Sequence, residues 1–216
     1  MIPTNIVPLP KATLVSSLES KSDPELAFSI VEAFSRRAKT SGIRDISMAD
    51  LASDLRMSTK TLYKVFANKR ELVQELVIRW EMRIRKPIEK YKGDLLTVLR
   101  YWVKVWVDND AQFSTQFWVD LKSDFPDLYQ VYVSSLYNRM GAMKERLSPY
   151  LKSDVNAEFA WSSYFILMTA SAQAKTYEKI GMTKEQCVFA AFDFWMRAAI
   201  DMESLAKGSD TNIQAI

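Results

Sequence analysis

The chain has 216 residues and a formal net charge of +3, and 48% of its residues are hydrophobic, so it can bury a sizeable core. It contains no histidine and a single cysteine, Cys187. This excludes Cys/His zinc sites, histidine-dependent nucleophile systems and an intramolecular disulfide. With only 5 glycines and 7 prolines, the chain has few tight turns. We therefore expect an all-α protein without a metal or cofactor, located in the cytoplasm.

The apolar stretches do not predict a membrane partner. Pro3, Pro8 and Pro10 interrupt the N-terminal apolar runs, which also lack the basic segment of a signal peptide. The longest apolar stretch, beginning at Phe159, is short and rich in Ser and Thr. A buried helix explains this stretch better than a membrane span.

Positive charge is concentrated in one part of the chain. Residues 36–92 contain 15 Lys and Arg against 7 Asp and Glu, whereas the remainder contains 14 against 19. A basic N-terminal module joined to a mildly acidic remainder is expected when one part meets a polyanion. A merely solvated helical surface is the alternative interpretation.

Three helices are predicted close together in the basic region. A proline-containing cap predicts a first helix over residues 24–40, and a Ser-x-x-Asp pattern predicts a short second helix over about 47–54. A third helix begins at Ser58, with Leu62 and Phe66 on its inward face. Two short helices joined tightly behind a longer one predict a tri-helical helix-turn-helix.

The remaining pattern is also helical. A fourth helix is predicted from Lys69 to Pro87. Further helices are predicted over about 94–108, 111–122, 126–147, 154–179 and 183–206. This gives about nine helices. We expect the chain to consist of a flexible arm (1–22), a helix-turn-helix domain (23–84), a larger helical domain (85–208) and a flexible tail (209–216).

The third helix carries short polar and basic side chains where a DNA-reading helix needs them. A helix in the major groove requires such side chains near its N-terminus, with cations or hydroxyls aimed at flanking phosphates. The candidate DNA-binding residues are Arg44, Ser47, Ser58, Thr59, Lys60, Thr61, Tyr63, Lys64 and Lys69.

Residues 26–76 resemble the DNA-binding domain of the TetR family of transcription regulators. The family pattern Ser-x-x-Thr-Leu-Tyr-x-x-Phe-x-x-Lys-x-x-Leu is matched by Ser58, Thr61, Leu62, Tyr63, Phe66, Lys69 and Leu72. The resemblance implies that Ser47, Tyr63 and Lys69 touch phosphates, and that Thr59, Lys60 and Thr61 approach bases. Two departures are Arg56, where many members have glycine in the turn, and Lys60, where a small residue is usual. Arg56 must therefore adopt the conformation of the turn without the freedom of glycine.

The resemblance implies that the larger domain senses a ligand and dimerises. Aromatic side chains can line an apolar pocket for a flat or lipophilic molecule. The candidate pocket residues are Trp102, Trp106, Phe113, Phe117, Trp118, Tyr132, Trp161, Tyr164, Phe165 and Met168. The candidate dimer-interface residues, on the last two long helices, are Ala160, Leu167, Ser171, Ala191, Phe194, Trp195 and Ala198.

The sequence thus predicts a homodimeric, ligand-responsive DNA-binding regulator, a repressor released by a small apolar or aromatic effector. Its partners would be a pseudo-palindromic double-stranded DNA operator, the effector and a second copy of the chain. Two alternatives stay open: a helical interaction protein of the same fold without DNA binding, and an all-helical enzyme with an apolar cavity. The absence of histidine and of any cofactor motif argues against the enzyme.

Overall fold

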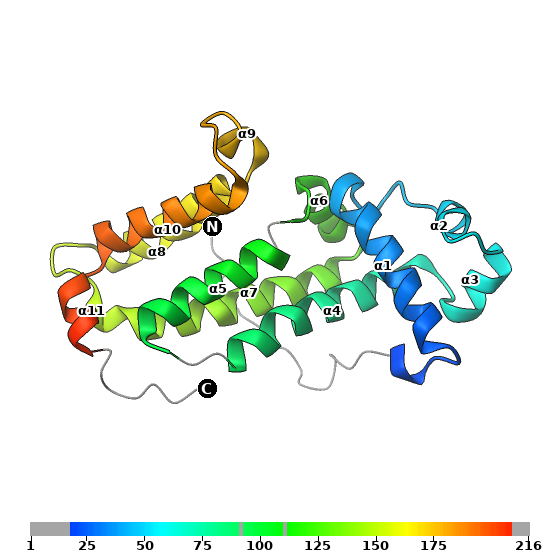
Figure 1. Cartoon of the computed structure of the whole chain (residues 1–216), viewed down its shortest axis with the longest axis horizontal. Coiled ribbons are helices and arrows are strands. Elements are labelled where there is room, and N and C mark those ends of the chain that lie inside the picture. Colours follow the sequence, from blue (N-terminus) through cyan, green and yellow to red (C-terminus); the bar gives the residue numbers. More distant parts are fainter. Residues whose placement is uncertain (1–17, 91–92, 110–111, 209–216) are drawn as a thin grey trace. The chain divides into compact units, whose positions relative to one another are not determined.

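The structure is a computed structural model that describes residues 18–90, 93–109 and 112–208. Within these residues the regular structure is helical, with eleven α-helices and no β-strand, so the all-α prediction is confirmed (Figure 1). None of the described helices is both long and apolar enough to cross a membrane. The predicted tail and the first 17 residues of the predicted arm lie outside the described residues. The end of that arm forms a 3-10 helix, η2 (Leu18–Ser20).

Two compact units divide the chain. The first comprises residues up to Arg83 together with Gln112–Tyr137, and the second comprises Ile84–Ala111 together with Asn138 onward. The predicted domain boundary at residues 84 and 85 stays a prediction. The two compact units differ from the predicted domains because α6 (Thr115–Asp124), which lies in the predicted larger domain, packs against α1 (Pro24–Ser41).

The first unit begins with the three helices of the predicted helix-turn-helix. Asp23 caps α1 by accepting a hydrogen bond from the Leu26 amide at 2.9 Å, and Gly42 ends this helix with a φ of 85°. The second and third helices are α2 (Met48–Asp54) and α3 (Thr59–Val65), which pack against each other (Figure 1). The largest fully buried side chains of this unit are those of Ile30, Phe34, Ile43, Leu51, Leu62, Phe66, Leu72, Phe117 and Leu121.

Residues up to Arg83 of α4 (Lys69–Lys90) and up to Tyr137 of α7 (Pro126–Leu147) complete the first unit. Glu81 of α4 and Ser135 of α7 are hydrogen-bonded, and the rings of Trp80 and Tyr132 also meet between these helices. The first unit therefore extends beyond the three helices that the sequence placed together.

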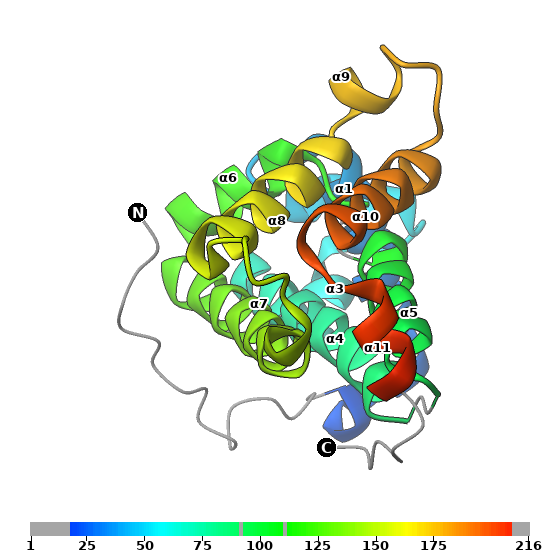
Figure 2. The same ribbon diagram turned by 90° about the vertical axis from the view of Figure 1, so that its left-hand side faces the viewer.

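The second unit is built on α5 (Leu95–Asn109), α8 (Ala157–Ser171) and α10 (Lys184–Ala199), with the end of α7 and the short η3 (Ser148–Tyr150). Helices α8 and α10 run side by side (Figure 2). Their buried face, with that of α5, forms one hydrophobic core. Trp195 is fixed in this core by its indole N–H, which donates to the Ala160 carbonyl at 2.8 Å.

Two long helices predicted from the sequence are each divided in the structure. The segment predicted as one helix over 154–179 forms α8 and α9 (Ala174–Tyr177), with a break at Ala172 and Gln173. The segment predicted over 183–206 forms α10 and α11 (Met202–Gly208), with a break at Ile200. Ile200 is extended because Leu151 pairs with it as an isolated β-bridge.

Candidate nucleic-acid interface

Helix α3 separates its side chains into a buried face and an exposed face. Leu62 and Phe66 are fully buried, whereas Tyr63, between them, has half of its surface exposed. Lys60 and Lys64 are also exposed on α3. The two apolar anchors therefore fix the rotation of α3, and its polar and basic side chains point outward.

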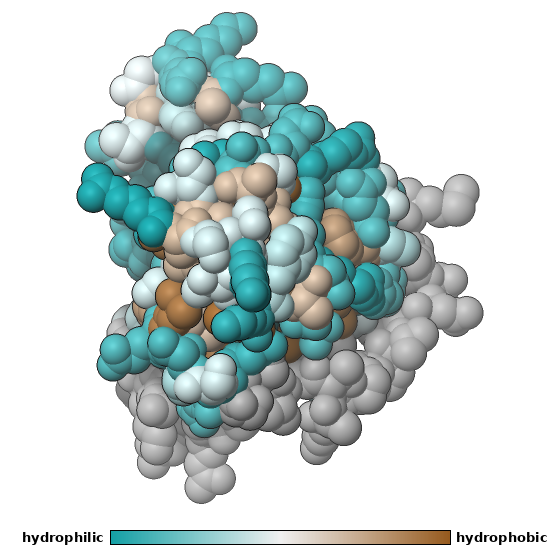
Figure 3. Space-filling view, turned by 90° about the vertical axis from the view of Figure 1, so that its right-hand side faces the viewer, coloured by the Kyte–Doolittle hydropathy of each residue, from teal (hydrophilic) through white to brown (hydrophobic). Residues whose placement is uncertain are grey.

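The serines that begin α2 and α3 are engaged as helix caps. Ser47 Oγ accepts a hydrogen bond from the Asp50 amide at 3.0 Å and donates one to the Asp50 carboxylate at 2.6 Å. Ser58 Oγ accepts from the Thr61 amide at 3.0 Å, and its hydroxyl lies 2.8 Å from that of Thr61. Seen from the side of α2 and α3, the surface is mostly hydrophilic, with scattered hydrophobic residues (Figure 3).

The turn between α2 and α3 has a left-handed residue at Arg56, with a φ of 52°. The amide of Arg56 donates to the Ser53 carbonyl at 3.0 Å, and that of Met57 donates to the Ala52 carbonyl at 2.9 Å. These two hydrogen bonds form a Schellman motif, whose left-handed position usually holds glycine. The conformation expected at Arg56 is therefore present in the structure.

Arg44 and Lys69, two of the candidate DNA-binding residues, hold the turn that joins α1 to α2. The guanidinium of Arg44 donates to Asp124 at 2.8 and 3.0 Å and to Ser123 at 2.7 Å. The ammonium of Lys69 donates to the Arg44 carbonyl at 2.7 Å, and partial burial lowers the pKa of Lys69. Both cations therefore have protein partners in the unbound chain.

Asp120 on α6 binds the same turn from the other side. Its carboxylate accepts hydrogen bonds from the Ile43 amide at 2.7 Å, the Arg44 amide at 2.9 Å and the Gln116 side chain at 2.6 Å. Burial alone would raise the pKa of Asp120, but these hydrogen bonds outweigh burial and lower the pKa. A Cβ at Gly42 would lie 2.5 Å from Oδ2 of Asp120, so only glycine permits this approach.

Sequence reasoning missed this contribution of α6. Gln116, Asp120 and Asp124 recur every four residues and therefore lie on one face of the helix. That spacing is a readable signal of a polar contact surface. The sequence contains no sign that this surface meets the turn at residues 43 and 44.

Residues 30–76 match the family model described as "Bacterial regulatory proteins, tetR family". They form a TetR-family helix-turn-helix domain. The match ends within α4 and leaves the larger helical region uncovered. No curated protein matches the chain.

Solved structures share the fold of the chain beyond this TetR-family domain. A Mesorhizobium loti protein assigned to the TetR family is 16% identical, with a TM-score of 0.52 over 82% of this chain and 97% of its own. A transcriptional regulator from Cytophaga hutchinsonii is 17% identical, with a TM-score of 0.55 over 82% and 100%. SmeT, the repressor of the Stenotrophomonas maltophilia multidrug efflux pump SmeDEF, is 13% identical, with a TM-score of 0.52 over 81% and 90%. The chain therefore has the fold of TetR-family transcriptional regulators.

The candidate pocket residues lie in both compact units. Phe113, Phe117, Trp118 and Tyr132 belong to the unit that contains the TetR-family domain, where their rings contact one another in series. The other six, Trp102, Trp106, Trp161, Tyr164, Phe165 and Met168, belong to the second unit. Most of these six fill or border its core, but Phe165 is exposed. That the ten residues line one effector pocket stays a prediction.

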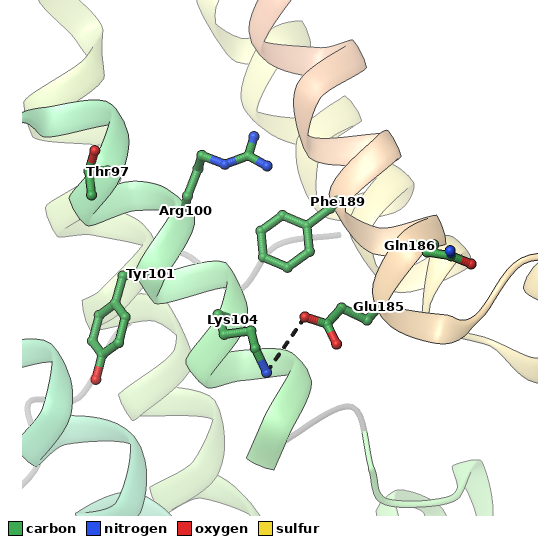
Figure 4. A pocket seen from close by; sticks show the side chains of 7 residues that line it. All are labelled: Thr97, Arg100, Tyr101, Lys104, Glu185, Gln186 and Phe189. Carbon is green, nitrogen blue, oxygen red and sulfur yellow. Dashed lines mark ion pairs between the residues drawn. The ribbon is translucent and has the colours of Figure 1, made fainter.

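A groove of about 710 Å³ lies on the second unit, and none of the candidate pocket residues lines it. Figure 4 shows its walls, which come from α5 and α10: Thr97, Arg100, Tyr101, Lys104, Glu185, Gln186 and Phe189. Acidic partners balance both cations, since Arg100 pairs with Asp193 and Lys104 lies 3.6 Å from Glu185. This wide and charge-balanced groove has no marked preference for an anion or a cation.

The candidate dimer residues divide by burial. Ala160, Ser171, Ala191 and Trp195 are buried within the second unit, and Leu167 is half-buried. Phe194 and Ala198 are exposed on α10. Two further exposed apolar side chains, Phe159 and Ile166 on α8, were missed by the sequence analysis. Their seven-residue spacing, which places both on one helical face, could have identified them.

Proposed function

We propose that the chain is a homodimeric, ligand-responsive transcriptional regulator that binds a pseudo-palindromic DNA operator. The observation that carries this proposal is the orientation of α3: buried Leu62 and Phe66 turn Tyr63, Lys60 and Lys64 outward. A helix presented in this way can enter the major groove, while its cations and its phenol reach phosphates. Two copies related by a twofold axis would read two half-sites about one helical turn apart.

The proposed dimer uses the outer faces of α8 and α10. Phe159, Ile166 and Phe194 have exposed fractions of 71%, 66% and 69%, which are large for such side chains. Burying them against the same face of a second copy would remove apolar surface from water. A self-complementary face of this kind is what a twofold dimer requires.

The proposed repressor role depends on two conformations with different spacings of the paired α3 helices. A ligand can release the operator only if it binds more tightly to the conformation that does not fit DNA. SmeT, a protein of the same fold, is a repressor, and this supports repression over activation. We propose a small apolar or aromatic effector.

The experiment that tests the proposal is selection of bound sequences from a random duplex pool, followed by affinity measurements at increasing salt. We expect an enriched pseudo-palindrome and an affinity that falls steeply as salt rises, because phosphate contacts release counterions. Failure to retain any duplex at physiological salt would overturn the proposal and favour an interaction protein of the same fold. Turnover of a substrate by the purified chain would favour the enzyme alternative.

A further inference from the structure

The two lysines of α3 lie on the side of the helix that faces away from its buried residues. An α-helix turns about 100° per residue, so Lys60 and Lys64 each lie roughly 160° from the buried Leu62 around the axis of α3. Both side chains are exposed. Tyr63 lies to the side of this line, at about 100° from Leu62. In a major groove entered by α3, the two lysines therefore face the floor of the groove.

These two lysines have no protein partner among the described residues. Neither Lys60 nor Lys64 has a hydrogen bond or an ion pair with any residue that the structure describes. Arg44 and Lys69, in contrast, already donate to oxygen atoms of the protein. An acceptor on DNA can therefore engage Lys60 or Lys64 without displacing any of the contacts within the described part of the chain.

The positions of the two lysines along α3 differ. Lys60 is the second residue of the helix, whereas Lys64 is the last but one. In a helix-turn-helix, residues at the N-terminal end of the recognition helix contact base edges. Thr61 at that end is half-buried, and its hydroxyl lies 2.8 Å from that of Ser58. The position of Lys60 therefore favours a base contact, and that of Lys64 favours a phosphate.

We propose that Lys60 determines the specificity of the chain by donating hydrogen bonds to a guanine in each half-site of the operator. This inference rests on the proposed function, and it assigns to Lys60 a base in place of a phosphate. A small residue is usual at this position of the TetR-family pattern, and a small side chain has no ammonium group. The contact is therefore a property of this chain and does not follow from the family pattern.

The choice of guanine follows from the donors and acceptors in the major groove. A lysine ammonium group has three donors and no acceptor. Guanine presents two acceptors at its major-groove edge, O6 and N7. Adenine and cytosine each present an amino donor there, which opposes an ammonium group, and thymine presents a single acceptor beside a methyl group. Guanine is therefore the base that satisfies most donors of Lys60.

Parallel selections from a random duplex pool test the inference with a matched pair of variants. The unaltered chain should enrich a guanine at one position of each half-site. Lys60→Gln should lose this guanine and favour adenine there, because a glutamine side chain pairs with N6 and N7 of adenine. Lys64→Gln removes the same charge from the same side of α3, and should weaken binding to all sequences while keeping the guanine. A guanine that persists in Lys60→Gln, or is lost in Lys64→Gln, would overturn the inference.

Base analogues test the same contact without a change in the protein. The enriched duplex is labelled with a fluorophore and prepared with 7-deazaguanine or inosine in place of the guanine of one half-site. 7-Deazaguanine lacks the N7 acceptor, whereas inosine keeps N7 and O6 and lacks only the amino group in the minor groove. In anisotropy titrations, 7-deazaguanine should weaken binding by about fivefold and inosine by less than about twofold.

Lys60→Met is the control for the analogues, because methionine has no donor. This variant should bind the natural and the 7-deazaguanine duplexes equally. Lys60 is exposed, so the variant should fold, and urea denaturation verifies this. Equal binding of these two duplexes by the unaltered chain would overturn the inference.

The same measurements separate this inference from the proposed function. An enriched pseudo-palindrome in which no guanine depends on Lys60 would overturn the inference and leave the regulator intact. A chain that retains no duplex from the pool would overturn both.

Discussion

The carboxylate of Asp120 accepts a hydrogen bond of 2.7 Å from the backbone amide of Ile43, a residue 77 positions earlier in the chain. The same oxygen accepts the neighbouring Arg44 amide at 2.9 Å. One buried side chain on α6 therefore satisfies two consecutive backbone donors between α1 and α2. The position of this turn therefore depends on α6 as well as on the helix-turn-helix itself.

Replacing Asp120 with Ala should lower the free energy of unfolding by about 1.5–3 kcal/mol, because the buried Ile43 amide and the part-buried Arg44 amide lose a charged acceptor. It should also weaken operator binding, since the start of α2 is no longer held. Asp120→Asn is the matched variant: its amide oxygen can still accept both hydrogen bonds, so the loss should be smaller. Urea denaturation and operator anisotropy measure the two effects. Equal stability of the Ala variant and the unaltered chain would contradict this role.

The ion pair between Arg44 and Asp124 predicts a loss of stability in acid. The Arg44 guanidinium, and then the Ser123 hydroxyl, lower the pKa of Asp124 from 3.8 to about 2. The unfolded chain therefore takes up this proton at a higher pH than the folded chain does. The contribution of ionised Asp124 to the stability of the folded chain is complete above about pH 4 and is lost as the pH falls through about 2. Urea midpoints across this range should depend less on pH in Asp124→Asn.

Arg56→Gly should stabilise the chain by roughly 0.5–1 kcal/mol. Arg56 has a φ of 52°, a left-handed conformation that strains a residue with a Cβ but not glycine. Thermal unfolding measures the gain. Arg56→Ala is the control that removes the side chain and keeps the strain, so it should show no such gain. A melting temperature that rises equally in both variants would assign the effect to the arginine side chain.

The helix-turn-helix was predictable because its signals are local. Ser47 and Ser58 mark two helix starts, and Leu62 and Phe66 recur at helical spacing, so the sequence alone defines α2 and α3. The break in the last long helix was not predictable in this way. It depends on Leu151, which pairs with Ile200 from 49 positions away, although Asp201 then caps α11 as a local signal.

The candidate nucleic-acid interface was also predictable only where its signals are local. Tyr63 and Lys60 were correctly expected to lie outward, because buried neighbours fix the rotation of α3. The protein partners of Arg44 and Lys69 were missed, since Asp124 lies 80 residues from Arg44 and the spacing of α6 does not reveal its partner. Long-range polar contacts of this kind have no counterpart in a single sequence.

Tyr63→Ala should weaken operator binding by roughly tenfold or more while leaving stability nearly unchanged, because half of this side chain is exposed. Tyr63→Phe isolates the contribution of the hydroxyl. Leu62→Ala is the neighbouring contrast: it should cost about 2–5 kcal/mol of stability, since Leu62 is fully buried. Anisotropy titrations and urea denaturation distinguish the two positions. An unchanged operator affinity in a folded Tyr63→Ala protein would exclude the proposed docking of α3.

Phe194→Glu should convert the proposed dimer to a monomer, because it places a charge in the proposed interface, which also contains the exposed Phe159 and Ile166. The folded subunit should survive, since the Phe194 side chain is already 69% exposed. Ile180→Glu is the matched control, because Ile180 is also exposed but lies outside α8 and α10. Sedimentation velocity measures the mass of each variant. Loss of the dimer in Phe194→Glu alone should also weaken operator binding, since one recognition helix reads only one half-site. A dimer that persists in Phe194→Glu would exclude this face as the interface and would leave its three exposed apolar side chains without a role.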